Sequence, residues 1–303
     1  MRESSFDFES SFLSINPKKD NHVFIAGLAR SGSTILLNAI YQSKLFASLT
    51  YCDMPFVLAP NLFSKILFSQ KKFVLKERMH DDGIKYSLES PEALEEVFWK
   101  TFPHDNKESI GKFIIYLGMI MRKYNKNRYL SKNNQNIKKI EIISKNFKRS
   151  QILIPFRDPL QQGYSLLSQH KKFIDKSKID KFISYYLKWI GHTEFGPNYI
   201  PINNANLKFI NTMDINHWLE QWYLSYSYLF YSFKKHQNIN FICYEKLCSD
   251  QKYWFTIIDL LKIDKKYQFE FKESKKNFSK NIDSKLLLNV KSLYAQLICL
   301  DIK

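Results

Sequence analysis

Three short, mainly apolar stretches occur in the chain, at residues 22–27, 151–156 and 239–244. Each is shorter than a typical buried helix and is followed by small or polar residues, a pattern typical of a buried strand. Weaker runs at residues 73–76 and 128–130 predict two further strands. Together these runs predict a sheet that is covered on both faces.

Segments with a helical spacing of apolar residues lie between or after these runs. They cover residues 35–41, 91–102, 159–170, 215–236, 253–261 and 284–300. Asp158 suits the N-cap and Pro159 the first position of the helix that follows the second strand. Strands that alternate with helices predict an α/β fold, with a central, mostly parallel sheet between two helical layers.

Length and composition are consistent with this fold class. The chain has 303 residues, of which 45% are hydrophobic, so it can bury a sizeable core and is not of the disordered type. Because no internal repeat or long linker is visible, residues 21–303 are expected to form a single domain. The polar residues 1–20 are expected to form a loose N-terminal arm.

No apolar stretch approaches the roughly 20 residues that are needed to span a bilayer. The first residues include acidic side chains and lack the apolar centre of a secretory signal. Four cysteines show no metal-type spacing and read as reduced thiols; they are Cys52, Cys243, Cys248 and Cys299. We therefore expect a cytoplasmic protein without a metal site.

The net charge of +17 has three explanations: composition and solubility, an anionic ligand, or nucleic acid. A nucleic-acid partner needs a recognisable motif as well as charge. No zinc finger, basic zipper or RNA-binding aromatic signature is present, so no specific nucleic-acid partner is expected. A polyanionic small molecule would be attracted by the same field.

A glycine-containing turn follows the first predicted strand, in the segment from Gly27 to Thr34. Its spacing is that of a P-loop, but Ser33 stands where a nucleotide triphosphatase has lysine. Arg30 supplies a basic side chain two residues before Gly32. Backbone N–H groups at a helix N-terminus, together with a guanidinium, favour an anion. The turn therefore predicts an anion site made by Arg30, Ser31, Gly32, Ser33 and Thr34.

Residues 29–34 resemble the 5′-phosphosulfate loop of the PAPS-dependent sulfotransferases, with Ala29 in place of the usual proline. That family also carries an arginine at a strand end and a serine eight positions later, which together hold the 3′-phosphate of the nucleotide. Arg157, in an Arg-Asp-Pro sequence, and Ser165 have this spacing. Residues 241–247 are similar to the family's late strand and its Tyr-Glu segment, where Tyr244 and Glu245 are expected to be structural.

The resemblance implies a P-loop-like α/β/α fold with additional helices over the acceptor side. It also implies PAPS (3′-phosphoadenosine-5′-phosphosulfate) as sulfuryl donor, PAP (adenosine 3′,5′-bisphosphate) as product, and no required metal. The motif layout is closest to the tyrosylprotein, heparan-type and bacterial enzymes. The acceptor, a hydroxyl or an amine, stays open among saccharides, peptides, lipids and small metabolites.

The same resemblance suggests the catalytic groups. Arg30 and Lys132, which precedes Arg157 by 25 residues, are expected to stabilise charge on the bridging oxygen. Two candidates remain open for the general base. Asp53 has the better position by resemblance, whereas His80 has the better intrinsic pKa, about 6.5 against about 3.9 for an aspartate.

Four further residues are candidates for acceptor binding. Glu77 and Arg78 lie in a highly charged segment, and His192 and Glu194 lie in a loop with two glycines and a proline. The sequence therefore predicts a sulfotransferase. Two alternatives stay open: a P-loop kinase or hydrolase that lacks the usual lysine, and a non-enzymatic polyanion-binding protein.

Overall fold

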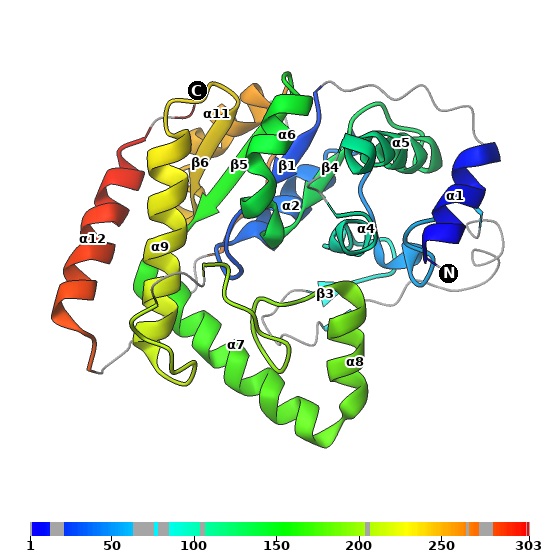
Figure 1. Cartoon of the computed structure of the whole chain (residues 1–303). Coiled ribbons are helices and arrows are strands. Elements are labelled where there is room, and N and C mark those ends of the chain that lie inside the picture. The colour runs from blue at the N-terminus through cyan, green and yellow to red at the C-terminus, as the bar shows by residue number, and fades with distance from the viewer. Residues whose placement is uncertain are drawn as a thin grey trace.

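The computed structural model describes residues 2–12, 21–62, 76–77, 85–103, 107–203, 207–264, 267–272, 281–300 and 302. Four parallel strands form its central sheet (Figure 1). Their order across the sheet is β4 (Leu130–Lys132), β1 (Val23–Ile25), β5 (Gln151–Phe156) and β6 (Ile239–Cys243). The three main apolar runs of the sequence are thereby confirmed as strands.

The two weaker runs differ from expectation. Within the strand predicted at residues 128–130, Tyr129 forms an isolated parallel bridge with Ala47. The strand that pairs with β1 therefore starts only at Leu130. Residues 73–75 lie outside the described part of the chain. Lys76–Glu77 (β2) pairs antiparallel with Lys85–Tyr86 (β3) in a separate two-stranded sheet.

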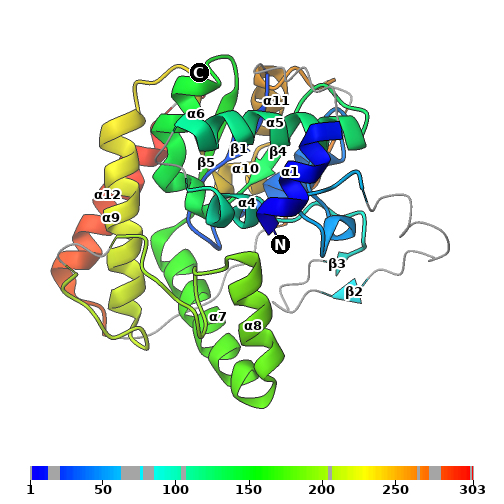
Figure 2. The same cartoon turned by 45° about the vertical axis from the view of Figure 1, so that its right-hand side comes forward.

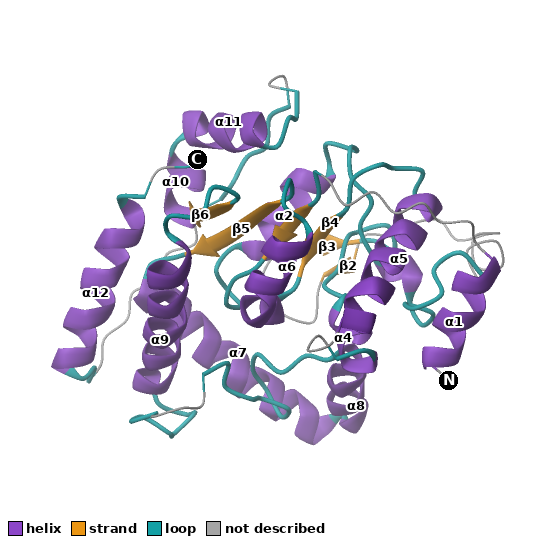
Figure 3. Cartoon of the chain, turned by 45° about the horizontal axis from the view of Figure 1, so that its top comes forward, coloured by secondary structure: helices purple, strands orange, loops and turns teal. Residues whose placement is uncertain are grey.

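Side chains of the central strands alternate between two faces, and each face has its own apolar core. Phe24 of β1 points into one core, whereas Val23 and Ile25 point into the other. The helices that contribute to the first core include α5 (Lys107–Lys123), α6 (Ile140–Asn146), α9 (Ile215–Phe233) and α12 (Ser284–Ile298). The helices of the second are α2 (Ser33–Tyr41), α10 (Tyr244–Ser249) and α11 (Gln251–Leu260). Figure 3 shows helices on both sides of the sheet, which confirms the predicted three-layer α/β/α class.

Three more helices lie beside this sandwich: α4 (Glu96–Thr101), α7 (Pro159–Ile179) and α8 (Lys181–Ile190). Helices α7 and α8 meet at Asp180, which ends the first and caps the second. We call residues 159–190 the α7–α8 arm. It lies on the side toward which the arrow of β5 points in Figure 1. Across the described residues, no helix combines the length and the apolar character needed to cross a bilayer.

The N-terminus differs from the loose arm expected for residues 1–20. Arg2–Phe12 forms helix α1, and Phe6 is only 2% exposed. Its ring packs against Phe98, Phe102 and Tyr116. A single buried aromatic in a polar segment gives no periodic signal, which is why the sequence pattern does not predict this packing. Residues 13–20 lie outside the described chain.

Replacing Phe6 by alanine tests whether α1 is part of the core. Removing a buried phenylalanine side chain costs about 3–5 kcal/mol of unfolding free energy. Phe8 on the same helix is 55% exposed, so Phe8→Ala is the matched control and changes stability by about 0.5 kcal/mol or less. Urea unfolding of both variants measures the difference. Equal, small losses would show that α1 does not pack as described.

Candidate active site

The carboxyl ends of the four parallel strands meet at one edge of the sheet. This is where ligands bind in open α/β folds. The segments that leave this edge begin at Ala26 after β1, Asn133 after β4, Arg157 after β5 and Tyr244 after β6. The turn, the lysine and the strand-end arginine singled out in the sequence therefore emerge at the same edge.

The turn after β1 leads directly into α2. Arg30 and Gly32 both have a left-handed backbone, with φ of 67° and 87°. Gly32 precedes the first residue of α2, and any Cβ at this position would overlap the ring of Tyr244. Glycine is thus required here for conformation and for space. The turn presents the N-terminus of α2, where backbone N–H groups favour an anion.

Arg30 contacts the helix that carries the second motif. Its Nε donates to Ser165 Oγ on α7 at 3.0 Å, although the two residues are 135 positions apart. Gln162 on the same helix donates to the carbonyl of Ala29 at 3.0 Å. Asp158 caps this helix by accepting a hydrogen bond from the Gln161 N–H. These contacts fix α7 against the turn and bring Arg30 to Ser165.

Arg157 lies against the ring of Tyr244, the ring that also lies beside Gly32. Its guanidinium stacks over Tyr244 at 5.0 Å, and its Nε lies 3.8 Å from a carboxylate oxygen of Glu245. Glu245 also accepts hydrogen bonds from the Asp158 N–H and the Tyr294 hydroxyl. Because the Tyr244 ring lies against both Gly32 and Arg157, it separates Arg157 from the turn that carries Arg30. Both Tyr244 and Glu245 thus hold the strand ends in place.

A cavity of about 140 Å³ opens beside the turn. Predicted residues that line it are Arg30, Ser33, Thr34, Lys132, His192 and Glu194. Other lining residues are Ala29, Tyr51, Tyr86, Glu92, Ala93, Glu96, Asn133, Asn134, Phe173, Tyr186, Leu187, Ile190, Gly191 and Phe195. The cavity is thus lined by the basic side chains of Arg30 and Lys132, by apolar side chains, and by three carboxylates, those of Glu92, Glu96 and Glu194. Of the charged residues that the sequence analysis singled out, Arg30, Lys132, His192 and Glu194 line the cavity, whereas Asp53 and Arg157 do not.

The loop pair His192 and Glu194 is buried beside Lys132. His192 Nε2 lies 3.5 Å from Glu194 Oε2, and Gln135 donates to the other Glu194 oxygen at 3.2 Å. Burial lowers the pKa of His192, in spite of the neighbouring carboxylate. Burial alone would raise the pKa of Glu194, but His192, Lys132 and the hydrogen bond from Gln135 hold it below its ordinary value. Glu194 is therefore ionised at neutral pH.

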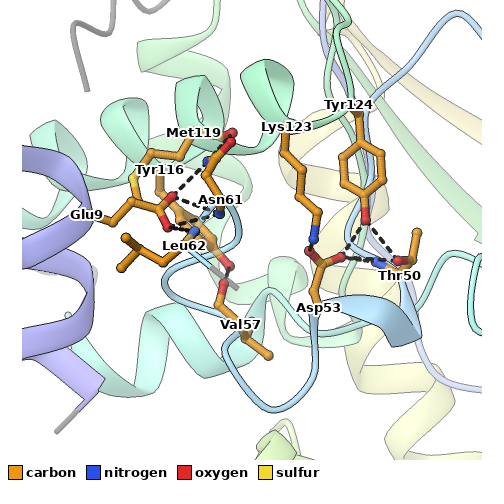
Figure 4. A network of polar contacts seen from close by, with 10 residues as sticks. All are labelled: Glu9, Thr50, Asp53, Val57, Asn61, Leu62, Tyr116, Met119, Lys123 and Tyr124. Carbon is orange, nitrogen blue, oxygen red and sulfur yellow. Dashed lines mark hydrogen bonds and ion pairs between the residues drawn. The ribbon is translucent and has the colours of Figure 1, made fainter. Parts of the chain in front are cut away.

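Asp53 lies elsewhere, in a buried polar network (Figure 4). Its carboxylate pairs with Lys123 at 2.7 Å and accepts hydrogen bonds from Tyr124 at 2.7 Å and from the Thr50 N–H at 2.6 Å. Asp53 closes the capping box of η1 (Tyr51–Asp53) and does not line the cavity. This placement disagrees with the expectation that Asp53 is the base, because the carboxylate is buried in an ion pair with Lys123 outside the cavity.

Three other predicted residues cannot be placed in the same way. His80 and Arg78 lie outside the described residues. Glu77 lies in β2, where only the backbone is described. Their predicted roles stay predictions.

Glu92 and Tyr51 are cavity residues that the sequence analysis missed. The Tyr51 hydroxyl donates to Glu92 Oε2, and the Ala93 N–H donates to the other oxygen at 2.8 Å. They meet because the Thr50 and Pro91 segments form an antiparallel bridge. This pairing joins segments about 40 residues apart by backbone hydrogen bonds, so no local motif could have revealed it.

A histidine holds the loop that carries His192 and Glu194. The Gly196 N–H donates to His170 Nδ1 at 3.0 Å, and His170 Nε2 lies 3.1 Å from the Thr212 hydroxyl. Since Nδ1 accepts a hydrogen bond, the imidazole is neutral, with its proton on Nε2. Burial, with His217 and Lys171 nearby, lowers the pKa of His170 to about 4.

Neither a family model nor a curated protein matches the chain. Among the solved structures that resemble it, sulfotransferase STF1 from Mycobacterium tuberculosis H37Rv has 12% identity and a TM-score of 0.47, over 96% of this chain and 75% of that one. Sulfotransferase STF9 from Mycobacterium avium has 10% identity and a TM-score of 0.44, over 97% and 72%. A sulfotransferase from Alicyclobacillus acidocaldarius has 11% identity and a TM-score of 0.43, over 91% and 92%. These likenesses are too distant to assign an activity, so the assignment depends on the chain's own residues.

Asp53→Asn tests the structural role of this carboxylate. The change leaves Lys123 buried without its anionic partner, so the free energy of unfolding falls by about 3–5 kcal/mol. The double variant Asp53→Asn with Lys123→Met removes both charges and recovers part of the loss. Urea unfolding measures both. Unchanged stability of the single variant would contradict the network described here.

The neutral state of His170 predicts a pH dependence of stability. Its pKa is about 4 in the folded chain and about 6.5 when unfolded, so only the unfolded state takes up the proton between these values. The stabilisation is complete above pH 6.5 and is lost as the pH falls toward 4. His170→Gln removes this part of the pH dependence, whereas His236→Gln, on an exposed histidine, retains it. Urea midpoints at pH 7 and pH 5 compare the variants.

Proposed function

We propose that this chain is a PAPS-dependent sulfotransferase, which transfers a sulfuryl group to a hydroxyl or an amine. One observation carries the proposal: the two anion-binding motifs of the sequence are in contact. Arg30 of the first motif hydrogen-bonds Ser165 of the second. Arg157 stacks on the ring that covers Gly32. This arrangement suits a ligand with an anionic group at each end.

Different residues would hold the two anionic ends of the donor. Arg30 and the N–H groups at the start of α2, from Ser31 to Thr34, would hold the 5′-phosphosulfate. Arg157 and Ser165 would hold the 3′-phosphate. Arginine suits both places, because its planar guanidinium matches the geometry of phosphate and sulfate oxygens. Tyr244, between the two sites, would keep their separation constant.

Lys132 and Arg30 line the cavity and would stabilise the negative charge that develops as the bond between sulfur and the bridging oxygen breaks. The acceptor oxygen or nitrogen forms the new bond to sulfur, and the electron pair of the broken bond leaves with PAP. Glu92 replaces Asp53 as the carboxylate candidate for the base that takes the acceptor proton. It lies in the cavity wall and is oriented by Tyr51. His80 stays the alternative base.

The two alternative functions, a P-loop kinase or hydrolase and a polyanion-binding protein, have less support. A P-loop kinase or hydrolase uses a lysine directly after the second glycine, and this chain has Ser33 there. A general polyanion binder would need only surface charge, and it gives no reason for Arg30 and Arg157 to follow two adjacent strands of one sheet.

Binding of PAP to Arg157→Ala tests the proposal. Hydrogen bonds to charged groups contribute about 1.5–3 kcal/mol each, so affinity should fall about 10- to 100-fold. Arg149→Ala is the matched control, because Arg149 is exposed just before the opposite end of β5. At about 100 times Kd, PAP stabilises the wild-type chain by about 2.7 kcal/mol in a magnesium-free thermal unfolding assay. Equal binding by both variants would refute the donor site.

Lys132→Met should separate binding from transfer. PAP affinity changes by less than tenfold, whereas transfer of labelled sulfate from PAPS into molecules of a cell extract falls at least 100-fold. Lys138→Met, on the exposed side of η2 (Asn134–Lys139), retains both. Mass spectrometry of the labelled products also identifies the acceptor. Full transfer by Lys132→Met would exclude the proposed role of Lys132.

A further inference from the structure

The end of the α7–α8 arm carries a cluster of exposed apolar side chains. Ile179 is 89% exposed, Phe182 68% and Tyr185 71%. Figure 2 shows that this part of the arm projects away from the sheet and its covering helices. Large apolar groups gathered at a projecting point, rather than scattered singly, mark a surface that binds something.

Helix α8 carries both cavity-lining and exposed apolar side chains. Tyr186, Leu187 and Ile190 line the cavity. The exposed Phe182 lies three positions from Tyr185 and four from Tyr186, on which its ring stacks, so the exposed apolar strip adjoins the cavity side of the helix. A helix that covers a core on one side normally has a polar outer side. Helix α8 departs from this rule, because Phe182 and Tyr185 are exposed.

Lysines surround the apolar cluster. Residues 171–188 contain six lysines and two aspartates, a net charge of +4. The exposed ones are Lys171, Lys178, Lys181 and Lys188. Both aspartates have local roles: Asp175 pairs with Lys178 at 3.0 Å, and Asp180 accepts the Phe182 N–H as the cap of α8. The field around the cluster is therefore positive.

We propose that the end of the α7–α8 arm docks onto an anionic phospholipid membrane. Ile179, Phe182 and Tyr185 would enter the boundary between headgroups and acyl chains, while the lysines contact the phosphates. Aromatic side chains prefer this boundary, and each nearby lysine strengthens binding to an anionic leaflet. The combination of apolar side chains with a basic surround is that of peripheral membrane helices.

Docking would have a consequence for the cavity. Its wall includes Tyr186, on which the exposed Phe182 stacks. A helix with side chains is about 10 Å across, so the cavity would lie within about that distance of the bilayer. The inference itself does not depend on the proposed transferase activity.

Co-sedimentation of the full chain with lipid vesicles tests the proposal. We expect binding to vesicles of equal parts phosphatidylcholine and phosphatidylglycerol, and much weaker binding to phosphatidylcholine alone. Phe182→Asp should weaken binding at least tenfold. Leu288→Asp is the matched control, because Leu288 is 69% exposed on α12, which lies far from α8 in Figure 1, and the change adds the same charge. Lys181→Glu should weaken binding at least fivefold, in line with about fivefold per lysine.

Circular dichroism confirms that each variant is folded, and Tyr185→Asp substitutes for Phe182→Asp if the latter does not fold. A wild-type chain that stays in solution with the anionic vesicles overturns the proposal. Equal loss of binding in Phe182→Asp and Leu288→Asp also overturns it, because the attraction would then come from the overall charge of the chain.

Discussion

The parallel pairing of β1 with β4 on one side and β5 on the other is the constraint on which the site depends. It places Ile25, at the end of β1, beside Lys132, at the end of β4, and beside Leu153, from which β5 continues to Phe156. The backbone that follows each strand must then leave at the same edge. Segments that are distant in the sequence thereby meet at this edge, whether or not their side chains contact one another. The contact between Arg30 and Ser165 refines an arrangement that the sheet has already imposed.

Much of the fold and part of the site could be predicted from the sequence. Strands β1, β5 and β6 are continuous apolar runs because both faces of the sheet are covered, and such runs are visible in a single sequence. The turn from Gly27 to Thr34 and the Arg157 segment are local motifs, so their positions at strand ends could also be predicted. What could not be predicted depends on contacts between distant segments.

Asp53 illustrates that limit. Its position in the sequence suits a catalytic carboxylate, but Lys123 and Tyr124, some 70 residues further on, occupy both of its oxygens. Whether an aspartate is a reactive group or a buried ion pair depends on a helix that arrives much later in the chain. Glu92 is the converse case. Nothing around it in the sequence marks it, and only the bridge between Thr50 and Pro91 brings it to the cavity.

The ring of Tyr244 has a thermodynamic consequence. It lies against both Gly32 and Arg157, and its hydroxyl donates a hydrogen bond to the carbonyl of Lys272. A displacement of one anchor is therefore transmitted to the other through a rigid aromatic spacer. Groups that share such a neighbour do not contribute independently to affinity. For the donor proposed above, the contributions of Arg30 and Arg157 to affinity would therefore be coupled, and a molecule with a single anionic group would lack that coupling.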